Sequence, residues 1–163
     1  MIILLTGESG VGKTTIGKLL SRDLTWKYFE GDDLHPSSNI EKMKRGVPLT
    51  DEDRYPWLKA IRQLIDELSV KKENAVITCS ALKKSYRELL LKDTKNVKLV
   101  YLYGEYQLIK NRILQRKHHF FNPRLLGSQS GTLEEPENAI KINVNKKPEE
   151  ITAIIKEALF GSS

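Results

Sequence analysis

Residues 7–14, which read Gly-Glu-Ser-Gly-Val-Gly-Lys-Thr, constrain the fold more than any other stretch because they match the pattern G-x-x-x-x-G-K-[ST]. An apolar run at residues 2–5 directly precedes them, and a helix-like segment at residues 15–24 directly follows. A buried strand, a glycine-rich turn and a helix N-terminus present main-chain N–H groups and the positive end of a helix dipole to an anion. The pattern therefore predicts a phosphate loop that binds a nucleoside triphosphate.

Each part of this loop has an expected role. The glycines allow close approach to an anion and positive φ angles. Lys13 should reach the β- and γ-phosphates, and the Thr14 hydroxyl is placed to ligate Mg²⁺. An ordinary glycine-rich turn is the alternative, and the complete motif in the required context disfavours it. The residues expected to contact the nucleotide are Gly7, Glu8, Ser9, Gly10, Val11, Gly12, Lys13, Thr14 and Thr15.

Length and composition limit the wider possibilities. The 163 residues suit one domain, and 39% hydrophobic with 29% charged residues is typical of a globular protein. No apolar run approaches the roughly 20 residues that span a bilayer. The first strand begins so close to Met1 that no signal or transit peptide is expected. The single cysteine, Cys79, excludes an internal disulfide and is compatible with a reducing cytoplasm.

The net charge of +6 could indicate a nucleic-acid partner. However, the basic residues are interleaved with acidic ones rather than gathered in one tract. A kinase that handles an anionic nucleotide and an acidic substrate would be basic for the same reason. We therefore expect a cytoplasmic protein with no nucleic-acid and no membrane partner.

Strand-like and helical patterns alternate along the chain. Continuous apolar runs of this kind favour a parallel sheet buried on both faces. Helical stripes lie between the runs, and the last helix is expected to begin at Pro148. This alternation predicts an α/β fold with right-handed crossovers in a three-layer α/β/α sandwich. The runs of strand length are residues 2–5, 26–29, 75–79, 97–103 and 140–144.

Two stretches fit no regular element well. Residues 31–54 are polar and contain two prolines and two glycines, with a short helix expected at residues 39–44. Residues 117–136 also carry prolines and glycines with mixed polarity. Long irregular segments in compact domains are often binding loops or lids. We therefore expect one kinase-like domain over residues 1–163, with a substrate-binding insert at 31–54 and a lid at 117–136.

A phosphate loop identifies a ligand class but not an activity. A GTPase switch needs Asn-Lys-x-Asp to read guanine, and the only Asn-Lys-Lys, at residues 145–147, is followed by Pro148. A motor ATPase would carry Asp-Glu at the end of an apolar strand, whereas the run at 75–79 is followed by Ser80. The acidic residues 30–33 after the second run, with the arginines late in the chain, favour a small-molecule phosphotransferase.

Several strings have no role in phosphate-loop proteins generally. They lie at residues 31–36, 39–43, 46–54, 56–58, 79–87, 119–121, 128–129 and 133–136, together with Arg116. In these segments the sequence resembles the gluconokinase family, the small kinases that phosphorylate D-gluconate at its 6-hydroxyl. The segments occur in the same order and at similar spacing as in that family.

The resemblance implies ATP and Mg²⁺ as cofactors, 6-phospho-D-gluconate and ADP as products, and a homodimer. It also implies the fold of the phosphate-loop nucleotide kinases, with five parallel strands in the order 2-3-1-4-5. A kinase of another small acid or sugar, such as shikimate, or of a nucleotide is the alternative. A more distant alternative is a non-catalytic nucleotide- or RNA-binding protein.

Gluconate is a linear polyol that ends in a carboxylate, so its site needs cations and many hydrogen-bonding groups. Arginine offers a planar fork for the carboxylate. Without the resemblance, Arg54 would read as a solvated helix-start residue that pairs with Asp51 or Glu52, and Lys83 as part of an exposed face. The resemblance implies a substrate-binding set of Asp32, His35, Arg54, Ser80, Lys83 and Arg87.

By resemblance to gluconate and shikimate kinases, Asp32 orients or deprotonates the acceptor hydroxyl, and Glu30 faces the metal. The strand period of two predicts that both acids lie on one side. Shikimate kinases carry Asp where this chain has Glu30, so which of the two acids is the base stays open. Loop solvation is the alternative for this acidic pair.

The late segment supplies the remaining candidates. Arg116 is expected to close over the phosphates as a catalytic lid arginine, with Arg124 as a second lid candidate. Arg112 is expected to flank the adenine or to make a structural ion pair. Residues 118–119, a His-His pair, are interpreted as solvated lid residues rather than metal ligands. Cys79 is interpreted as a packing residue rather than a nucleophile.

Overall fold

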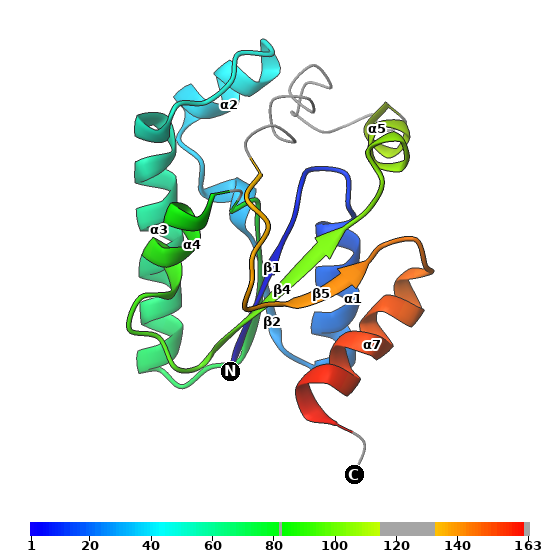
Figure 1. The fold of residues 1–163 in the computed structure, drawn as a ribbon. Helices are drawn as coiled ribbons and strands as arrows, with labels where there is room; N and C mark the ends of the chain where they lie inside the picture. Colours follow the sequence, from blue (N-terminus) through cyan, green and yellow to red (C-terminus); the bar gives the residue numbers. More distant parts are fainter. Residues whose placement is uncertain (82, 115–132, 162–163) are drawn as a thin grey trace.

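Figure 1 shows the fold in a computed structural model, which describes residues 1–81, 83–114 and 133–161. The elements alternate between strands and helices along most of the chain, as the sequence predicts. In chain order they are β1 (Ile2–Thr6), α1 (Lys13–Leu24), β2 (Lys27–Glu30), the 3₁₀ helix η1 (Gly31–Leu34), α2 (Ser37–Lys44), α3 (Asp51–Val70), β3 (Ala75–Cys79), α4 (Lys84–Leu91), β4 (Val97–Tyr103), α5 (Tyr106–Leu114), β5 (Ile140–Asn143) and α7 (Pro148–Phe160).

The five strands form one parallel sheet in the order β2-β3-β1-β4-β5, which confirms the predicted order. In the register of this sheet, Thr6 at the end of β1 lies beside Cys79 at the end of β3. Glu30 at the end of β2 lies beside Thr78. The carboxyl ends of these three strands therefore meet at one edge, where ligands bind in open α/β sheets.

Helices cover both faces of the sheet, with α3 and α4 on one side and α1 and α7 on the other (Figure 1). Successive residues of a strand point to opposite faces. Accordingly, Ile2 and Leu4 pack in the core under α3 and α4, whereas Ile3 and Leu5 pack under α1 and α7. The three-layer sandwich is thus confirmed. Of the helices that the structure describes, none has the length and apolar character needed to cross a membrane.

The segment at residues 31–54 is more regular than its polarity predicted. Residues 31–34 form η1, residues 37–44 form α2, and α3 already begins at Asp51. Thr50 and Asp53 form a capping box, because the Asp53 N–H donates to Thr50 Oγ1 at 3.0 Å and the Thr50 N–H donates to Asp53 Oδ2 at 2.9 Å. Hydrophobic periodicity does not predict this first turn, because the apolar stripe begins only at Trp57 and Pro56 directly precedes it.

Arg62 of α3 closes the C-terminal end of α4. Its Nη1 donates to the main-chain oxygens of Leu89, Leu90 and Lys92 at 3.3, 3.4 and 2.6 Å. Its Nε donates to Asp66 Oδ1 at 2.9 Å, which fixes the direction of the guanidinium. The last carbonyls of a helix have no partner within the helix, so a cation at this position supplies their hydrogen bonds and complements the helix dipole.

We expect Arg62→Met to keep the aliphatic contact but to lower the free energy of unfolding by about 1–2 kcal/mol, because the carbonyls at the end of α4 lose a charged donor. Urea denaturation followed by circular dichroism measures this difference. Lys59→Met, at an exposed position of the same helix, is the control and should change the value by less than about 0.5 kcal/mol. Equal effects of the two substitutions would contradict the capping role.

Candidate active site

Residues 7–12 connect β1 to α1 in the strand, turn and helix order that the motif predicted. Gly12 is the N-cap of α1 and has a φ of 101°, a left-handed conformation that favours glycine. Gly7 has a φ of 148°, and a Cβ atom there would lie 2.4 Å from the main-chain oxygen of Leu102 in β4. Glycine at these two positions therefore lets the loop turn tightly over the end of the sheet.

The Lys13 side chain is buried and lies back across the loop. Its Nζ donates to the main-chain oxygen of Gly7 at 2.8 Å and to that of Glu8 at 3.0 Å. A buried ammonium is costly unless it is hydrogen-bonded, so these carbonyls hold the charge inside the loop. The structure brings the predicted nucleotide-binding residues of this motif into one loop and the first turn of α1: Gly7, Glu8, Ser9, Gly10, Val11, Gly12, Lys13, Thr14 and Thr15.

The Glu30 carboxylate lies beside this loop and accepts three hydroxyl hydrogen bonds. Thr14 Oγ1 donates to Glu30 Oε2 at 2.7 Å, and the Tyr28 hydroxyl donates to the same oxygen at 2.5 Å. Thr78 Oγ1 of β3 donates to Glu30 Oε1 at 2.9 Å. The two residues predicted to serve a metal, Thr14 and Glu30, are thus in direct contact.

These contacts keep Glu30 ionised. Burial alone would raise the pKa of Glu30, but the hydrogen bonds from Tyr28, Thr14 and Thr78, with the charge of Lys13, outweigh it and lower the pKa. Burial, and then the hydrogen bond to Glu30, raise the pKa of the Tyr28 phenol. The pair therefore consists of a carboxylate and a neutral phenol that donates to it.

In the described part of the chain, no group of three or more His, Cys, Asp and Glu side chains is arranged to hold a metal. Thr14 and Glu30 instead offer one hydroxyl and one carboxylate next to the phosphate loop. Mg²⁺ in phosphoryl-transfer sites is typically held by one or two such groups together with waters and substrate phosphates. The donor chemistry fits a magnesium ion that arrives with a nucleotide.

Asp32 lies just beyond Glu30 but not on a strand. Because β2 ends at Glu30 and η1 begins at Gly31, the strand alternation that predicted both acids on one side does not extend to Asp32. Asp32 is half-buried and Asp33 is exposed. Burial raises the pKa of the Cys79 thiol, and the negative charge of Asp32 raises it further, so Cys79 remains a neutral packing residue.

His35 directly follows η1 and packs against α3. Its ring stacks on Trp57 with centroids 4.2 Å apart, and its Nδ1 lies 3.1 Å from Asn39 Nδ2. Trp57 Nε1 donates to the main-chain oxygen of Gly31 at 2.8 Å, which fixes the start of η1. Burial, with a smaller contribution from the charge of Arg54, lowers the pKa of His35 to about 4. His35 is therefore neutral near pH 7.

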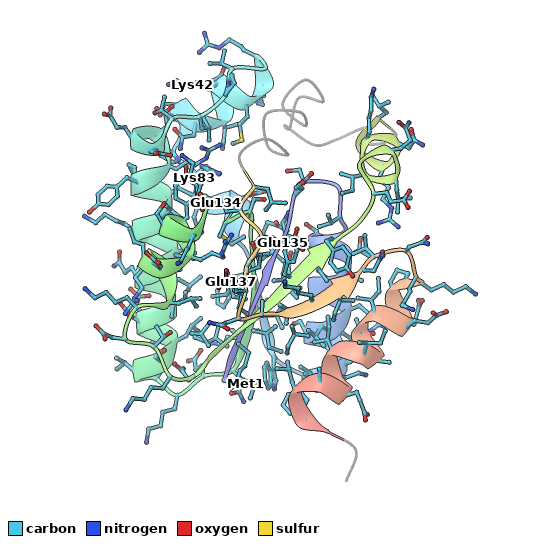
Figure 2. The ribbon with its side chains drawn as sticks, in the orientation of Figure 1. Met1, Lys42, Lys83, Glu134, Glu135 and Glu137 are labelled. Atoms are coloured by element: carbon cyan, nitrogen blue, oxygen red, sulfur yellow. The ribbon has the colours of Figure 1, made fainter. Side chains whose placement is uncertain are left out.

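Arg54 and Lys83 form a cationic cluster with Asp51 and Tyr86. Arg54 Nη1 donates to the Tyr86 hydroxyl at 3.0 Å, and that hydroxyl donates in turn to Asp51 Oδ1. Lys83 Nζ donates to both Asp51 oxygens, at 2.9 and 3.2 Å. In Figure 2, Lys83 and Lys42 lie toward the end of the molecule opposite Met1. The cluster is compatible with both interpretations of Arg54, as a residue beside an acidic side chain and as one that binds substrate. Asp51 lies beside both cations of the cluster, and both cations were predicted to bind substrate.

Arg87 of α4 is buried, and its described hydrogen bonds go to the main chain. Nη1 donates to the oxygen of Ala81 at 2.8 Å, and Nη2 donates to the oxygen of Glu134 at 2.5 Å. The Ala81 N–H donates to Thr6 Oγ1 at 3.2 Å. Arg87 thus fixes the chain just after β3, where the predicted Ser80 lies half-buried.

Arg112 connects α5 to the phosphate loop. Its Nη1 donates to the main-chain oxygen of Val11 at 3.4 Å, and its Nη2 donates to that of Val144 at 3.2 Å. These contacts are to carbonyls rather than to an acid, so they differ from the ion pair that was one of its two interpretations. The predicted lid residues Arg116, His118, His119 and Arg124 lie outside the described residues.

Several residues that shape this region were not predicted from the sequence. Tyr28 could have been predicted, because the period of two on β2 places Tyr28 on the same face as Glu30. Thr50 and Asp53 carry a capping-box spacing, and Lys42 Nζ donates to Asp53 Oδ2 at 2.8 Å. That bond, followed by the one from the Thr50 N–H, lowers the pKa of Asp53 to about 2. The contacts of Tyr86 depend on tertiary packing and leave no local pattern.

Comparison with known proteins gives a consistent result. A family model described as shikimate kinase matches residues 9–157. A probable gluconokinase of Mus musculus is 40% identical over 97% of this chain and 97% of its own length. The thermosensitive gluconokinase of Escherichia coli K12 is 40% identical over 96% of this chain and 86% of its own length. Among solved structures, a gluconokinase from Sinorhizobium meliloti 1021 superposes with a TM-score of 0.82 at 36% identity, covering 97% of this chain and 94% of that one.

We expect acidification to destabilise the protein through His35. Its pKa falls from the usual 6.5 to about 4 on folding, so between these pH values the unfolded chain binds more protons, and stability drops as the pH is lowered. From pH 7 to pH 5 the free energy of unfolding should decrease by about 1–2 kcal/mol from this group alone.

Chemical denaturation at the two pH values measures the loss, with His35→Phe as the comparison because a phenyl ring preserves the stacking on Trp57. The variant should lose much less stability over the same interval. The same pH dependence in both proteins would show that His35 is not the responsible group.

Proposed function

This chain belongs to the gluconokinase family, and we propose that it transfers the γ-phosphoryl group of ATP to the 6-hydroxyl of D-gluconate, giving 6-phospho-D-gluconate and ADP. The observation that carries this proposal is the 2.7 Å hydrogen bond between Thr14 and Glu30. It joins the phosphate loop to the acidic segment that begins the proposed acceptor site, so a donor phosphate and an acceptor hydroxyl could be held at the same edge of the sheet.

At the donor end, the main-chain N–H groups of the loop and the Lys13 ammonium would bind the triphosphate. Thr14 and Glu30 would hold Mg²⁺, which when bound neutralises charge on the phosphate oxygens. We propose Arg116 as the lid arginine that approaches the transferring group. Arg112 is proposed to support the nucleotide site, and its hydrogen bond to the Val11 carbonyl favours a role in shaping the loop.

At the acceptor end, Asp32 would orient the 6-hydroxyl and take its proton. It lies two residues after the carboxylate that contacts Thr14, and it is half-buried, whereas Asp33 is exposed. Phosphoryl transfer depends on positioning and charge more than on covalent chemistry, so one well-placed carboxylate is sufficient as a base.

Arg54 and Lys83 are proposed to bind the gluconate carboxylate. Lys83 donates to both oxygens of the Asp51 carboxylate, and this contact with a carboxylate supports the proposal. Neutral His35 and the Ser80 hydroxyl would contact the substrate hydroxyls. Arg87 would support the segment that carries Ser80 through its hydrogen bond to the Ala81 carbonyl. By the family resemblance, we further propose one kinase domain and a cytoplasmic homodimer without nucleic-acid or membrane partners.

We expect a coupled ADP-release assay with Mg²⁺ and ATP to detect turnover with D-gluconate and not with shikimate or nucleoside monophosphates. Shikimate is included because the matching family model is that of shikimate kinases. Turnover with shikimate alone would replace the proposed acceptor. Binding to RNA that weakens steeply with salt, together with no ATP consumption, would instead favour a non-catalytic nucleic-acid partner.

We expect Asp32→Asn to lower kcat by a factor of about 10²–10⁴, because the amide cannot accept the hydroxyl proton. The KM for ATP should stay near its original value, since the phosphate loop is unchanged. Asp33→Asn removes the same charge from the exposed neighbour and should leave kcat nearly unaffected. Steady-state kinetics of the two variants would contradict the assignment if Asp32→Asn retained the original kcat.

A further inference from the structure

We infer that Tyr28 is a positioning residue for the metal–nucleotide site, because its hydroxyl holds the Glu30 carboxylate against Thr14. The inference rests on the proposed function, since it takes Thr14 and Glu30 as the groups that serve Mg²⁺ with ATP. Tyr28 itself need not contact metal, nucleotide or substrate to have this effect.

The sheet brings the donors to Glu30. Tyr28 and Glu30 are alternate residues of β2, so they lie on the same face, and Glu30 pairs in register with Thr78 of β3. The Tyr28 hydroxyl donates to Glu30 Oε2 at 2.5 Å, and Thr78 Oγ1 donates to Oε1 at 2.9 Å. Each carboxylate oxygen therefore receives a hydrogen bond from the sheet, which fixes the rotation of the carboxylate.

The position of Oε2 determines the direction of the Thr14 hydroxyl. Thr14 Oγ1 donates its proton to Oε2 at 2.7 Å. A hydroxyl whose proton points to a carboxylate keeps its lone pairs directed elsewhere, where they can ligate a cation. Loss of a group that orients a metal ligand typically lowers metal affinity by about 10–100-fold. Tyr28 therefore acts on the cation site through Glu30 and Thr14 in sequence.

Helix α1 contains a gap that the Tyr28 ring fills. A Cβ atom at Gly17 would lie 2.7 Å from Tyr28 Cε2 and 3.0 Å from Thr78 Cγ2. Glycine inside a helix is unfavourable, and here its lack of a side chain lets the ring pack against the same helix that carries Thr14. A phenylalanine would fill this gap equally well but would have no proton to donate. The tyrosine hydroxyl is thus the part of the residue that the packing does not explain.

The need for this hydroxyl follows from the length of Glu30. A glutamate has one more rotatable bond than an aspartate, so an unrestrained carboxylate would sample more positions. The Tyr28 and Thr78 donors restrict it to the one that meets Thr14. The extra methylene of Glu30 and the hydroxyl of Tyr28 therefore act as a matched pair.

Binding of Mn²⁺ in the presence of ADP and the absence of gluconate tests the inference, with Mn²⁺ as the paramagnetic substitute for Mg²⁺. Electron paramagnetic resonance of unbound Mn²⁺ gives its Kd. Tyr28→Phe should raise this Kd on the order of tenfold. The affinity for ADP without a divalent cation should not change. Tyr55→Phe, which removes a hydroxyl from an exposed tyrosine of α3, should change neither quantity.

A double-mutant cycle shows whether Tyr28 acts through Glu30. In a Glu30→Gln background, Tyr28→Phe should raise the Mn²⁺ Kd by less than about twofold, because the two substitutions affect one interaction. A full tenfold effect in both backgrounds would overturn the inference. So would an unchanged Kd in the single variant, or an equal loss of ADP affinity without metal, which would indicate a distorted loop.

Thr78→Val provides an independent variant should Tyr28→Phe fold poorly. It removes the donor to Oε1 and should raise the Mn²⁺ Kd in the same direction, and no change would count against the positioning of Glu30 by the sheet. Because gluconate is absent from these measurements, they distinguish the two proposals. A protein that does not use gluconate would still show the effect of Tyr28 on metal binding.

Discussion

Parallel pairing brings the carboxyl ends of β2, β3 and β1 to one edge of the sheet, and the chemistry of the protein is arranged along that edge. The phosphate loop leaves β1 there, the acidic segment leaves β2, and Ser80 follows β3. The Glu30 carboxylate is shared between all three, since it accepts from Thr14 after β1, from Tyr28 on β2 and from Thr78 on β3. A change in strand register would move every one of these groups together.

Main-chain carbonyls are the partners of several buried or half-buried cations. In each case the cation closes a helix end or ties a loop to its neighbour, so part of the positive charge of the chain supports the fold. This use is compatible with the net charge of +6 and does not require a nucleic-acid partner. The cations are Lys13, Arg62, Arg87 and Arg112.

The sheet and the phosphate loop were predictable because each rests on a local pattern. Continuous apolar runs define the strands, and the glycine spacing defines the loop. The start of α3 was not predicted, because its first turn depends on polar capping residues and Pro56 follows in the next turn. The hydrogen-bond partners of Arg87 could not be predicted either. One is the carbonyl of Glu134, 47 residues away, and a main-chain carbonyl leaves no signature in the sequence. The strand argument does not reach Asp32, because β2 ends two residues earlier, at Glu30.

Asp51 places an internal anion among the cations proposed to bind the substrate carboxylate. The hydrogen bonds from Tyr86 and then Lys83 lower its pKa, so it stays charged across the physiological range. If Lys83 binds the substrate carboxylate as proposed, that carboxylate would replace or share the contact that Asp51 now makes with the Lys83 ammonium. The net charge of this cluster is therefore lower than its two cations alone would give, because Asp51 already neutralises part of it.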